Sequence, residues 1–422
     1  MKRWPDGAAR RRTGVIFAYI NGNLANTHRD GRLIRLLRAG VRIVCLGLCA
    51  TLCTACAFAS SVSAKSRPEE VLDLMERVAD WQLAHPSKHD PATWTQCAGY
   101  TGFMALAAIS SDGRFHNAML RMGERNGWRL GTEGSPYLAD DHCVGQVYAD
   151  LYMQHGDSAM IAPMRARFDW ILAHPTNDNL STDRARNPDA GTGWWWCDAL
   201  FMAPPAWLRL AKATHHQAYL DFMIQHWWQT SEYLYDPVEH LYFRDDRFFA
   251  RREANGRKVF WSRGNGWVMA GLARVLQDLP KDHPSRPRFV KQFREMAERI
   301  VTLQQTDGFW RASLLDPASY PMQETSGTGF YVYALGWGIN EGFLERSIFE
   351  SVVMNGWKAL VGSVRDDGKL VHVQPIGETP RHFDEESTEV YGVGAFLLAG
   401  SEVYRLLRRP SAPLREPRQP TN

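Results

Sequence analysis

WSRGNGWVMAGLA, at residues 261–273, is the stretch of sequence that decides the fold. Its small residues Gly266, Ala270 and Gly271 lie at helical spacing, and such residues allow helix axes to approach one another closely. We therefore expect a helix that starts near residue 264 and belongs to a crowded inner layer of helices. The polar and aromatic residues 261–267 lie at the start of that helix.

Working outward from this stretch, we predict twelve helices in two alternating classes. One class is amphipathic, with apolar residues at helical spacing and charged residues between them. Its members are expected to start near residues 68, 113, 157, 215, 288 and 345. The other class is rich in small and aromatic residues. Its members are expected to start near residues 97, 141, 197, 264, 326 and 388.

Six amphipathic outer helices and six small-residue inner helices predict an all-α fold. We expect an (α/α)6 barrel, a single-domain toroid of six helical hairpins. Repeated helical hairpins also build open solenoids, but a count of six with irregular spacing favours a closed ring. The sequence allows short β-hairpins around residues 240–260 and 364–376.

Residues 1–64 are predicted to form a signal peptide with an N-terminal extension. Arginines precede an apolar run over residues 43–59, and small residues end at Ala64, the pattern of a cleaved secretory signal. We expect an exported, periplasmic protein. The alternative is that the segment remains as a membrane tether or as a lipid anchor at Cys56. The catalytic domain is then expected over residues 65–408, followed by a flexible tail at 409–422.

Composition and cysteine usage exclude several classes of protein. The formal charge of the 422-residue chain is +3, and no long basic run lies outside the first dozen residues, so nucleic acid is not an expected partner. Only Cys97, Cys143 and Cys197 lie outside the predicted signal, which allows at most one disulfide.

No His, Cys and Asp residues have metal-ligand spacing, and no phosphate or dinucleotide motif occurs in a fitting context. We therefore expect neither a metal nor a cofactor. Oligomeric state is left open.

Five polar and aromatic segments each precede an inner helix, at residues 137–142, 194–198, 261–267, 323–327 and 384–388. In a toroid these segments gather at one rim, around the central cavity, and loops on a rigid scaffold commonly carry function. The chain also has sixteen tryptophans, whose flat rings suit sugars as well as they suit a core. We expect about two in three to be core residues.

Asp198 is the leading catalytic candidate. It follows three consecutive tryptophans, whose apolar rings would raise its pKa, and it stands at a helix start, which would lower its pKa. If desolvation prevails, Asp198 is a competent general acid for glycoside chemistry. The alternative, of equal weight on these grounds, is an N-cap.

The other candidates lie on neighbouring rim segments. Asp140 and Asp141 are adjacent, so one is expected to cap a helix while the other faces the cavity. Arg263, between Trp261 and Trp267, has the fork geometry that holds a carboxylate, and the two rings can stack on a sugar. The alternative for Arg263 is a structural ion pair. The remaining candidates for substrate binding are His142, His240 and Trp196.

The motifs at residues 196–205, 261–267 and 324–327 resemble glycoside hydrolase family 105, the unsaturated rhamnogalacturonyl hydrolases, related to the unsaturated glucuronyl hydrolases of family 88. The resemblance extends over roughly residues 70–406. It implies an (α/α)6 barrel that removes a 4,5-unsaturated uronic acid from the non-reducing end of lyase-generated oligosaccharides. An aspartate protonates C4 and helps to activate a water that adds at C5. The resulting hemiketal opens and releases the neighbouring sugar.

Within this resemblance, Asp198 matches the acid/base, and the second aspartate falls at Asp140 or Asp141. Trp261, Arg263 and Trp267 match the group that binds the sugar and its carboxylate, together with His240. The family also has a histidine before the catalytic aspartate, and residues 187–189 have none. The preferred uronide is therefore open.

Four functions remain in view at this point. The favoured substrate is an unsaturated rhamnogalacturonan fragment, and an unsaturated glucuronyl end from ulvan or a glycosaminoglycan is the first alternative. The same toroid also hosts inverting glucanases, which act on an intact glycosidic bond. A non-catalytic carbohydrate-binding protein would keep the tryptophans without needing Asp198.

Overall fold

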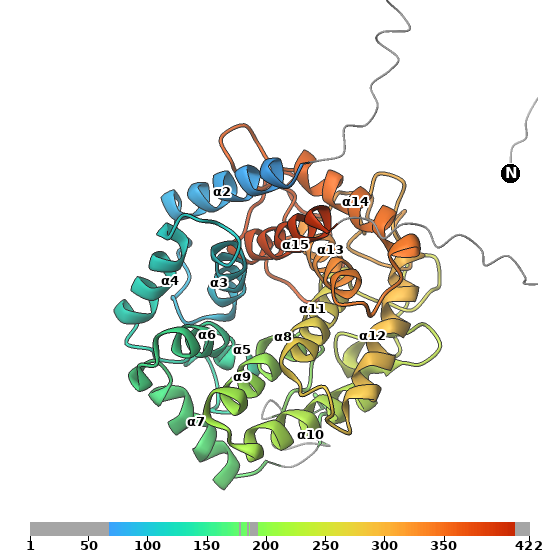
Figure 1. The fold of residues 1–422 in the computed structure, drawn as a ribbon. Helices are drawn as coiled ribbons and strands as arrows, with labels where there is room; N and C mark the ends of the chain where they lie inside the picture. The colour runs from blue at the N-terminus through green and yellow to red at the C-terminus, as the bar shows by residue number, and fades with distance from the viewer. Residues whose placement is uncertain (1–66, 177–178, 184, 186–192, 410–422) are drawn as a thin grey trace, which may run out of the picture. The chain divides into compact units, whose positions relative to one another are not determined.

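Helices make up nearly all of the structure, a computed structural model that describes residues 67–176, 179–183, 185 and 193–409. Six long helices form an outer ring and six form an inner ring (Figure 1). The outer helices are α2 (Pro68–Ala84), α4 (Arg114–Arg125), α7 (Ala162–Ala173), α10 (Gln217–Leu234), α12 (Arg286–Val301) and α14 (Arg346–Gly362). The inner helices are α3 (Trp94–Ala107), α6 (Gly145–His155), α9 (Pro204–Thr214), α11 (Ser262–Asp278), α13 (Thr325–Asn340) and α15 (Val390–Arg408). The predicted all-α fold is confirmed, and nine of the twelve helices start within three residues of the expected position. The exceptions are α6, α7 and α9, which start four, five and seven residues later than expected, because a separate short turn precedes each of them.

The inner ring is closed. Each inner helix contacts the next, from α3 through α6, α9, α11 and α13 to α15, and α15 in turn packs along α3. The rival open solenoid is therefore excluded, because in a solenoid the first and last repeats do not meet.

Small residues allow this close packing, as the sequence predicts. A methyl group on Gly102 of α3 would lie 2.6 Å from the main-chain oxygen of Gly394 on α15. One on Gly271 of α11 would lie 2.3 Å from the main-chain oxygen of Leu200. Every residue of α13 is buried. In the outer ring, by contrast, α12 buries one face, with Phe289, Phe293, Met296 and Ile300 all inaccessible to solvent.

Two of the inner helices are preceded by a separate single turn, which the sequence did not predict. The turns are α5 (Ala139–His142) and α8 (Ala199–Met202). Pro204 and Pro205 open α9 and have no backbone N–H to continue a preceding helix, so α8 ends at Met202. Asp140 and Asp198 therefore lie on short turns at the rim rather than within long helices.

Strand structure in the described chain is limited to one short hairpin, β1 (Tyr235–Asp236) and β2 (Leu241–Tyr242), paired antiparallel with Tyr235 opposite Tyr242. Isolated bridges join Arg252 to Lys258 and Val364 to Leu370. A short 3-10 turn, η2 (Asp246–Phe248), follows the hairpin, and another, η1 (Ser158–Met160), precedes α7. Hairpin-like pairing thus occurs in both predicted regions, although β1 begins before residue 240.

Other sequence predictions fall partly outside the described residues. Cys97, Cys143 and Cys197 are all free and buried, so the described chain contains no disulfide. Of the described helices, α15 alone has the length and composition of a membrane span, and 83% of its apolar window is buried within the protein, as expected of an inner helix. The predicted signal at residues 1–64 lies outside the described residues, as does nearly all of the predicted tail at 409–422, and both stay predictions.

Candidate active site

A cavity of about 310 Å³ lies where the inner helices begin. Three of the five predicted rim segments line it, those at residues 137–142, 194–198 and 261–267, together with residues of α3 and α8, Arg244 and a loop at residues 376–378. The segments at residues 323–327 and 384–388 contribute no lining residue. The lining residues are Trp94, Asp140, Trp196, Asp198, Met202, Arg244, Trp261, Arg263, Trp267, Ile376, Gly377 and Glu378. Six of the nine residues predicted as site residues therefore meet in one cavity. Helix N-termini carry partial positive charge, so this end of the inner ring suits an anionic ligand.

Asp198 stands at the N-cap position of α8, but its carboxylate makes no capping hydrogen bond to the backbone. Its side chain instead accepts a weak hydrogen bond from the Cys197 thiol at 3.4 Å, and one carboxylate oxygen lies 3.8 Å from Nε of Arg244. Burial raises the pKa of Asp198, although Arg244 opposes the shift. The capping alternative is therefore not what the structure shows, and the carboxylate is available to the cavity.

The structure also distinguishes Asp140 from Asp141. Asp140 lines the cavity, and its carboxylate accepts no hydrogen bond from any described residue. The carboxylate of Asp141 does not line the cavity and accepts hydrogen bonds from the backbone amides of Glu133 at 3.0 Å and Gly134 at 3.3 Å. Asp141 therefore holds the preceding loop in place, and Asp140 is the better candidate for the second catalytic aspartate.

Asp140 and Asp198 act on one another electrostatically. Burial, and then the negative charge of Asp198, raise the pKa of Asp140 to about 8. Two carboxyl groups that share a low-dielectric site resist losing both protons, so the pair retains one proton near neutral pH. Arg244 lies beside Asp198, which places the negative charge on Asp198 and the proton on Asp140. A cavity with one carboxylic acid and one carboxylate is equipped to donate one proton and accept another.

Arg263 lies in the cavity wall, but its guanidinium is held by the protein. Nη1 donates to the main-chain oxygen of Gln374, and Nη2 donates to that of Pro375 at 3.0 Å. The guanidinium also lies 4.5 Å from the ring centre of Trp261, whose indole N–H donates to the Gln374 side chain at 2.8 Å. Neither of its bonded groups is a carboxylate, so the predicted structural ion pair is not formed. Arg263 and Trp261 together fix the loop that forms one wall of the cavity.

The tryptophans at the site are largely buried. Trp267 is 1% exposed and packs against Phe330 at 4.2 Å between ring centres and edge-on to Trp94 at 6.1 Å. Trp196 is 3% exposed and lies against Trp195. Both shape the cavity, and the small exposed parts of their rings are what a bound sugar can contact.

The two predicted histidines lie elsewhere. The imidazole of His142 bonds the main-chain oxygen of Pro136 at 2.9 Å and accepts from the indole N–H of Trp207 at 3.3 Å. Burial lowers the pKa of His142 to about 3, so it is a neutral core residue. His240, in the β1–β2 turn, bonds the hydroxyl of Tyr235 at 3.0 Å. Neither residue lines the cavity, and the prediction that they bind substrate there has no support in this geometry.

Arg244 is the functional residue that sequence reasoning missed. It follows β2, and its guanidinium lies over the ring of Trp195 and pairs with Asp245 at 2.7 Å and with Glu378 at 3.5 Å. Nε of Arg244 is buried and has no hydrogen-bond partner among the described residues. The guanidinium thus presents an unused donor beside Asp198. One signal was available, because residues 244–247 read RDDR, a dense charged run beside an apolar strand.

The described residues contain no group of three His, Cys, Asp or Glu side chains that could hold a metal ion. The chemistry supported by this geometry is that of the carboxyl pair and the arginines around it.

Two relatives of known name are similar to this chain over most of its length. One, from Alteromonas sp., is an unsaturated 3S-rhamnoglycuronyl hydrolase that is 35% identical over 348 residues, covering 78% of this chain and 84% of its own. The other, from Formosa agariphila, has the same name and is 38% identical over 348 residues, covering 80% of this chain and 91% of its own.

Solved structures share the fold. A glycosyl hydrolase family 88 protein from Bacteroides vulgatus is 30% identical with a TM-score of 0.72, covering 81% of this chain and 99% of its own. A protein described as a polysaccharide lyase is 33% identical with a TM-score of 0.74, covering 82% of this chain and 100% of its own. A possible family 105 member from Salmonella enterica, 17% identical with a TM-score of 0.67, covers 81% of this chain and 95% of its own and shares the fold.

The family model for Glycosyl Hydrolase Family 88 matches residues 60–407, which include every residue of the cavity. The sequence motifs resemble family 105 and, through it, the related family 88. The match to the family 88 model confirms this resemblance. This chain is a glycoside hydrolase and belongs to Glycosyl Hydrolase Family 88.

Proposed function

We propose that this protein removes a 4,5-unsaturated uronic acid from the non-reducing end of an oligosaccharide by hydrating the C4–C5 double bond. The observation that carries the proposal is the pair Asp140 and Asp198, which meet in one aromatic-walled cavity with raised pKa values. The similarity to two unsaturated 3S-rhamnoglycuronyl hydrolases supports the same chemistry.

The pair holds one proton to donate and one carboxylate to accept a proton, which are the two groups that the reaction needs. Asp140, as the resting acid, supplies the proton that forms the new C4–H bond, and positive charge develops at C5. Water adds at C5, and Asp198, as the resting carboxylate, accepts its proton. The double bond is lost, the pair ends with the same number of protons, and the C5 hemiketal opens to release the neighbouring sugar. This assignment gives Asp198 the role of base toward water, whereas the family resemblance gives it both proton transfers.

The size of the cavity favours action at a chain end. A volume of about 310 Å³ is at the small end of ligand pockets, which range from about 300 to 1,000 Å³. The loop at residues 376–378 forms part of its wall, and Arg263 anchors that loop through the two preceding residues. Such an enclosure suits one terminal sugar, whereas a glucanase that cuts within a chain needs a groove through which the chain can pass.

Arg244 is our candidate for recognition of the uronate. Both terminal nitrogens of Arg263 donate to main-chain oxygens, whereas Nη2 of Arg244 makes no hydrogen bond to any described residue. The Nε atoms of both arginines are buried and lack a hydrogen-bond partner within the described chain, so they do not distinguish the two residues. Arg244 lines the cavity, and a guanidinium N–H there without a protein partner favours a carboxylate ligand. Arg263 then contributes positive charge and holds the wall.

For the substrate, we propose an unsaturated uronic acid linked to rhamnose. The two relatives are named for a rhamnoglycuronyl unit, and a third relative, from Bacillus subtilis and 25% identical over 42% of this chain, is named for a rhamnogalacturonyl unit. Rhamnose next to the uronyl residue is the element shared by these names. We also propose that residues 1–64 direct the protein out of the cytoplasm, where polysaccharide fragments are met.

The ultraviolet absorbance of the C4–C5 double bond tests the function. Purified protein is incubated with lyase-generated fragments of a rhamnoglycuronan and of a rhamnogalacturonan, with Asp198→Asn as the inactive control. The proposal expects absorbance to fall, fastest with one of these two fragment sets. A rise in absorbance with intact polysaccharide would instead identify a lyase, the activity for which one similar structure is named. Unchanged absorbance, with cleavage of saturated glycans, would identify a glucanase.

A further inference from the structure

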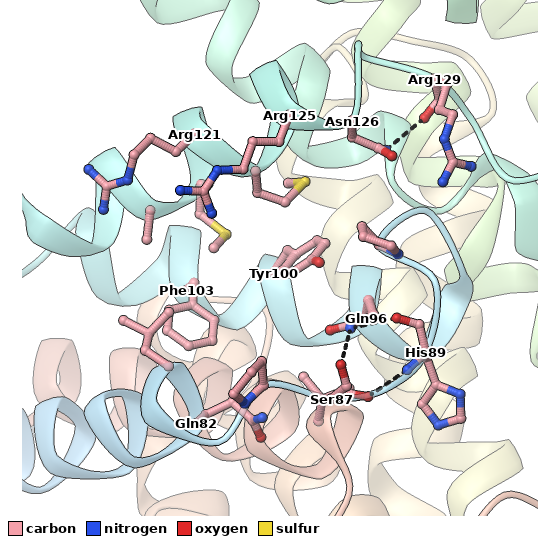
Figure 2. Close-up of a pocket in the computed structure, with 17 residues that line it drawn as sticks. Gln82, Ser87, His89, Gln96, Tyr100, Phe103, Arg121, Arg125, Asn126 and Arg129 are labelled. Carbon is pink, nitrogen blue, oxygen red and sulfur yellow. Dashed lines mark hydrogen bonds between the residues drawn. The ribbon is translucent and has the colours of Figure 1, made fainter.

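A second, larger cavity lies outside the active site, between the outer helices α2 and α4 and the inner helix α3. Its volume is about 770 Å³, more than twice that of the active cavity at about 310 Å³. Figure 2 shows Arg121 and Arg125 along one side, with Tyr100 and Gln96 in the middle and Gln82 on the opposite side. We call this cavity the α2–α4 pocket.

Several polar groups in the α2–α4 pocket lack partners within the described part of the chain. The amide nitrogens of Gln82 and Gln96 bond main-chain oxygens, but neither amide oxygen accepts a hydrogen bond from a described residue. Both residues are 8% exposed, but their amide oxygens are not among the buried atoms that lack a partner, so both oxygens are accessible from the pocket. The hydroxyl of half-buried Tyr100 also makes no hydrogen bond to any described residue. Three accessible polar groups without a protein partner therefore give the pocket the means to hydrogen-bond a polar ligand.

The charge of the lining is positive. Arg121, Arg125 and Arg129 all line the pocket, and no described aspartate or glutamate does. Arg129 pairs with Asp90 at 2.6 Å, whereas Arg121 and Arg125 are exposed and form no ion pair or hydrogen bond with any described residue. They lie one helical turn apart on α4, so their like charges repel slightly unless an anion lies between them.

Apolar surface completes the pocket. Leu83 is 41% exposed at the lining, and the ring of Tyr100 forms part of it. Amide and hydroxyl groups for sugar hydroxyls, guanidinium groups for an acid and an aromatic face for the ring are the features that recognise an acidic saccharide. A flat apolar peptide groove would not leave open amide acceptors on its floor.

We propose that the α2–α4 pocket is a second, non-catalytic binding site for an acidic oligosaccharide. Its volume gives room for at least two sugar residues if the active cavity holds one. The existence of this site does not depend on the proposed function. The choice of glycan as its ligand rests on that function. Helix α3 separates the two sites, because Trp94 at its start lines the active cavity while Gln96 and Tyr100 line the pocket. Binding of an acidic chain in this pocket keeps the enzyme on the polysaccharide whose chain ends it hydrolyses.

Isothermal titration calorimetry with a saturated ligand tests this inference separately from catalysis. The probe is a saturated tetrasaccharide of alternating uronic acid and rhamnose, which has no double bond to hydrate. Its carboxyl-reduced counterpart is the neutral control. We expect the double variant Arg121→Gln/Arg125→Gln to bind the acidic probe about tenfold more weakly than the wild type, a difference of about 1.4 kcal/mol. The neutral probe should bind wild type and variant alike.

The matched protein control is Arg77→Gln/Lys358→Gln, which removes the same charge from positions on α2 and α14 that do not line the pocket. This control should bind the acidic probe as the wild type does. Tyr100→Phe, which removes one hydroxyl and keeps the ring, should also weaken binding. Hydrolysis of an unsaturated disaccharide should be unchanged in the arginine variant. The proposal is overturned if the acidic probe does not bind, or if it binds the arginine variant and the wild type equally.

Discussion

At the scale of single residues, adjacent positions in the sequence have opposite roles in the structure. Asp140 turns an unbonded carboxylate to the cavity, whereas Asp141 bonds two backbone amides and His142 enters the core. The sequence places all three at one rim, but it does not say which way each side chain points. Successive residues of a helical turn face directions about 100° apart, so only one of three neighbours can face the cavity.

Asp198→Asn is expected to abolish turnover without weakening the fold. Its pKa is raised in the folded protein, so any stabilising contribution is lost as pH rises through that pKa, and the charged form at neutral pH is a cost. Removing the charge therefore leaves the melting temperature unchanged or higher. Turnover should fall by about 10²–10⁴-fold, the usual contribution of general acid–base catalysis. Retention of most activity would disprove the assigned role.

Asp141→Asn is the informative contrast. Each carboxylate oxygen of Asp141 accepts one backbone amide, and an asparagine would place an N–H against one of those donors. We expect a loss of about 1–3 kcal/mol in the free energy of unfolding, with turnover per folded molecule largely retained. Thermal unfolding and activity measured on the same samples separate the two variants.

The pH profile of kcat/KM should be bell-shaped. Activity requires one proton on the pair, and Asp140 loses its proton as pH rises through about 8, so the rate should fall above that pH. On the acid side, Asp198 becomes protonated and no longer accepts a proton from water. That decline should lie above the ordinary aspartate pKa of 3.8, because burial raises the pKa of Asp198. A rate that stays constant well above pH 8 would contradict the resting proton on Asp140.

At the scale of elements, the active cavity depends on contacts between segments far apart in the sequence. Arg263 at the start of α11 holds the main-chain oxygens of Gln374 and Pro375, and the hydroxyl of Tyr391 on α15 also donates to the main-chain oxygen of Gln374 at 2.6 Å. Two inner helices thus converge on one loop. These hydrogen bonds hold the wall of the cavity in place.

Arg263→Lys should therefore impair the enzyme even though it preserves the charge. A lysine ammonium cannot reproduce the planar fork that reaches both main-chain oxygens. We expect the free energy of unfolding to fall by about 2 kcal/mol or more, with a higher KM as the loop at residues 376–378 loosens. Urea unfolding and steady-state kinetics would measure both effects. A variant with unchanged stability and KM would show that the loop is held by other contacts.

The elements themselves were largely predictable, because they depend on local patterns. The apolar spacing of α12 and the small residues of α11 are enough to indicate an outer and an inner helix from the order of residues alone. Asp198 was also within reach, since its motif lies at an inner-helix start. Arg244 was not, because its importance arises from contacts with Asp198 and Glu378, which lie in other segments of the chain. The pairing of Arg263 with main-chain oxygens is equally non-local.

At the scale of the whole molecule, closure of the ring implies that the last helix is indispensable. α15 packs against both α13 and α3, so it joins the two ends of the inner ring. A chain that stops before Val390 would expose the inner faces of both neighbours. We expect such a truncation to lack a cooperative thermal transition and to aggregate, as judged by circular dichroism and size-exclusion chromatography.

A chain that stops after Arg409 is the matched control. It retains all of α15 and lacks only the predicted tail, so its melting temperature should equal that of the full chain. A folded, soluble product from the shorter truncation would mean that the ring tolerates an opening.

Ring closure also sets the order in which the protein can finish folding. Helical proteins commonly fold fast because their contacts are local in sequence, but the pairing of α3 with α15 joins nearly opposite ends of the described chain. Synthesis produces the N-terminal helices first, so the apolar face of α3 stays exposed until almost the entire chain has been made. Exposed surface of this kind is what chaperones recognise. The contact between α3 and α15 that closes the ring therefore makes the nascent chain dependent on chaperones until α15 has been synthesised.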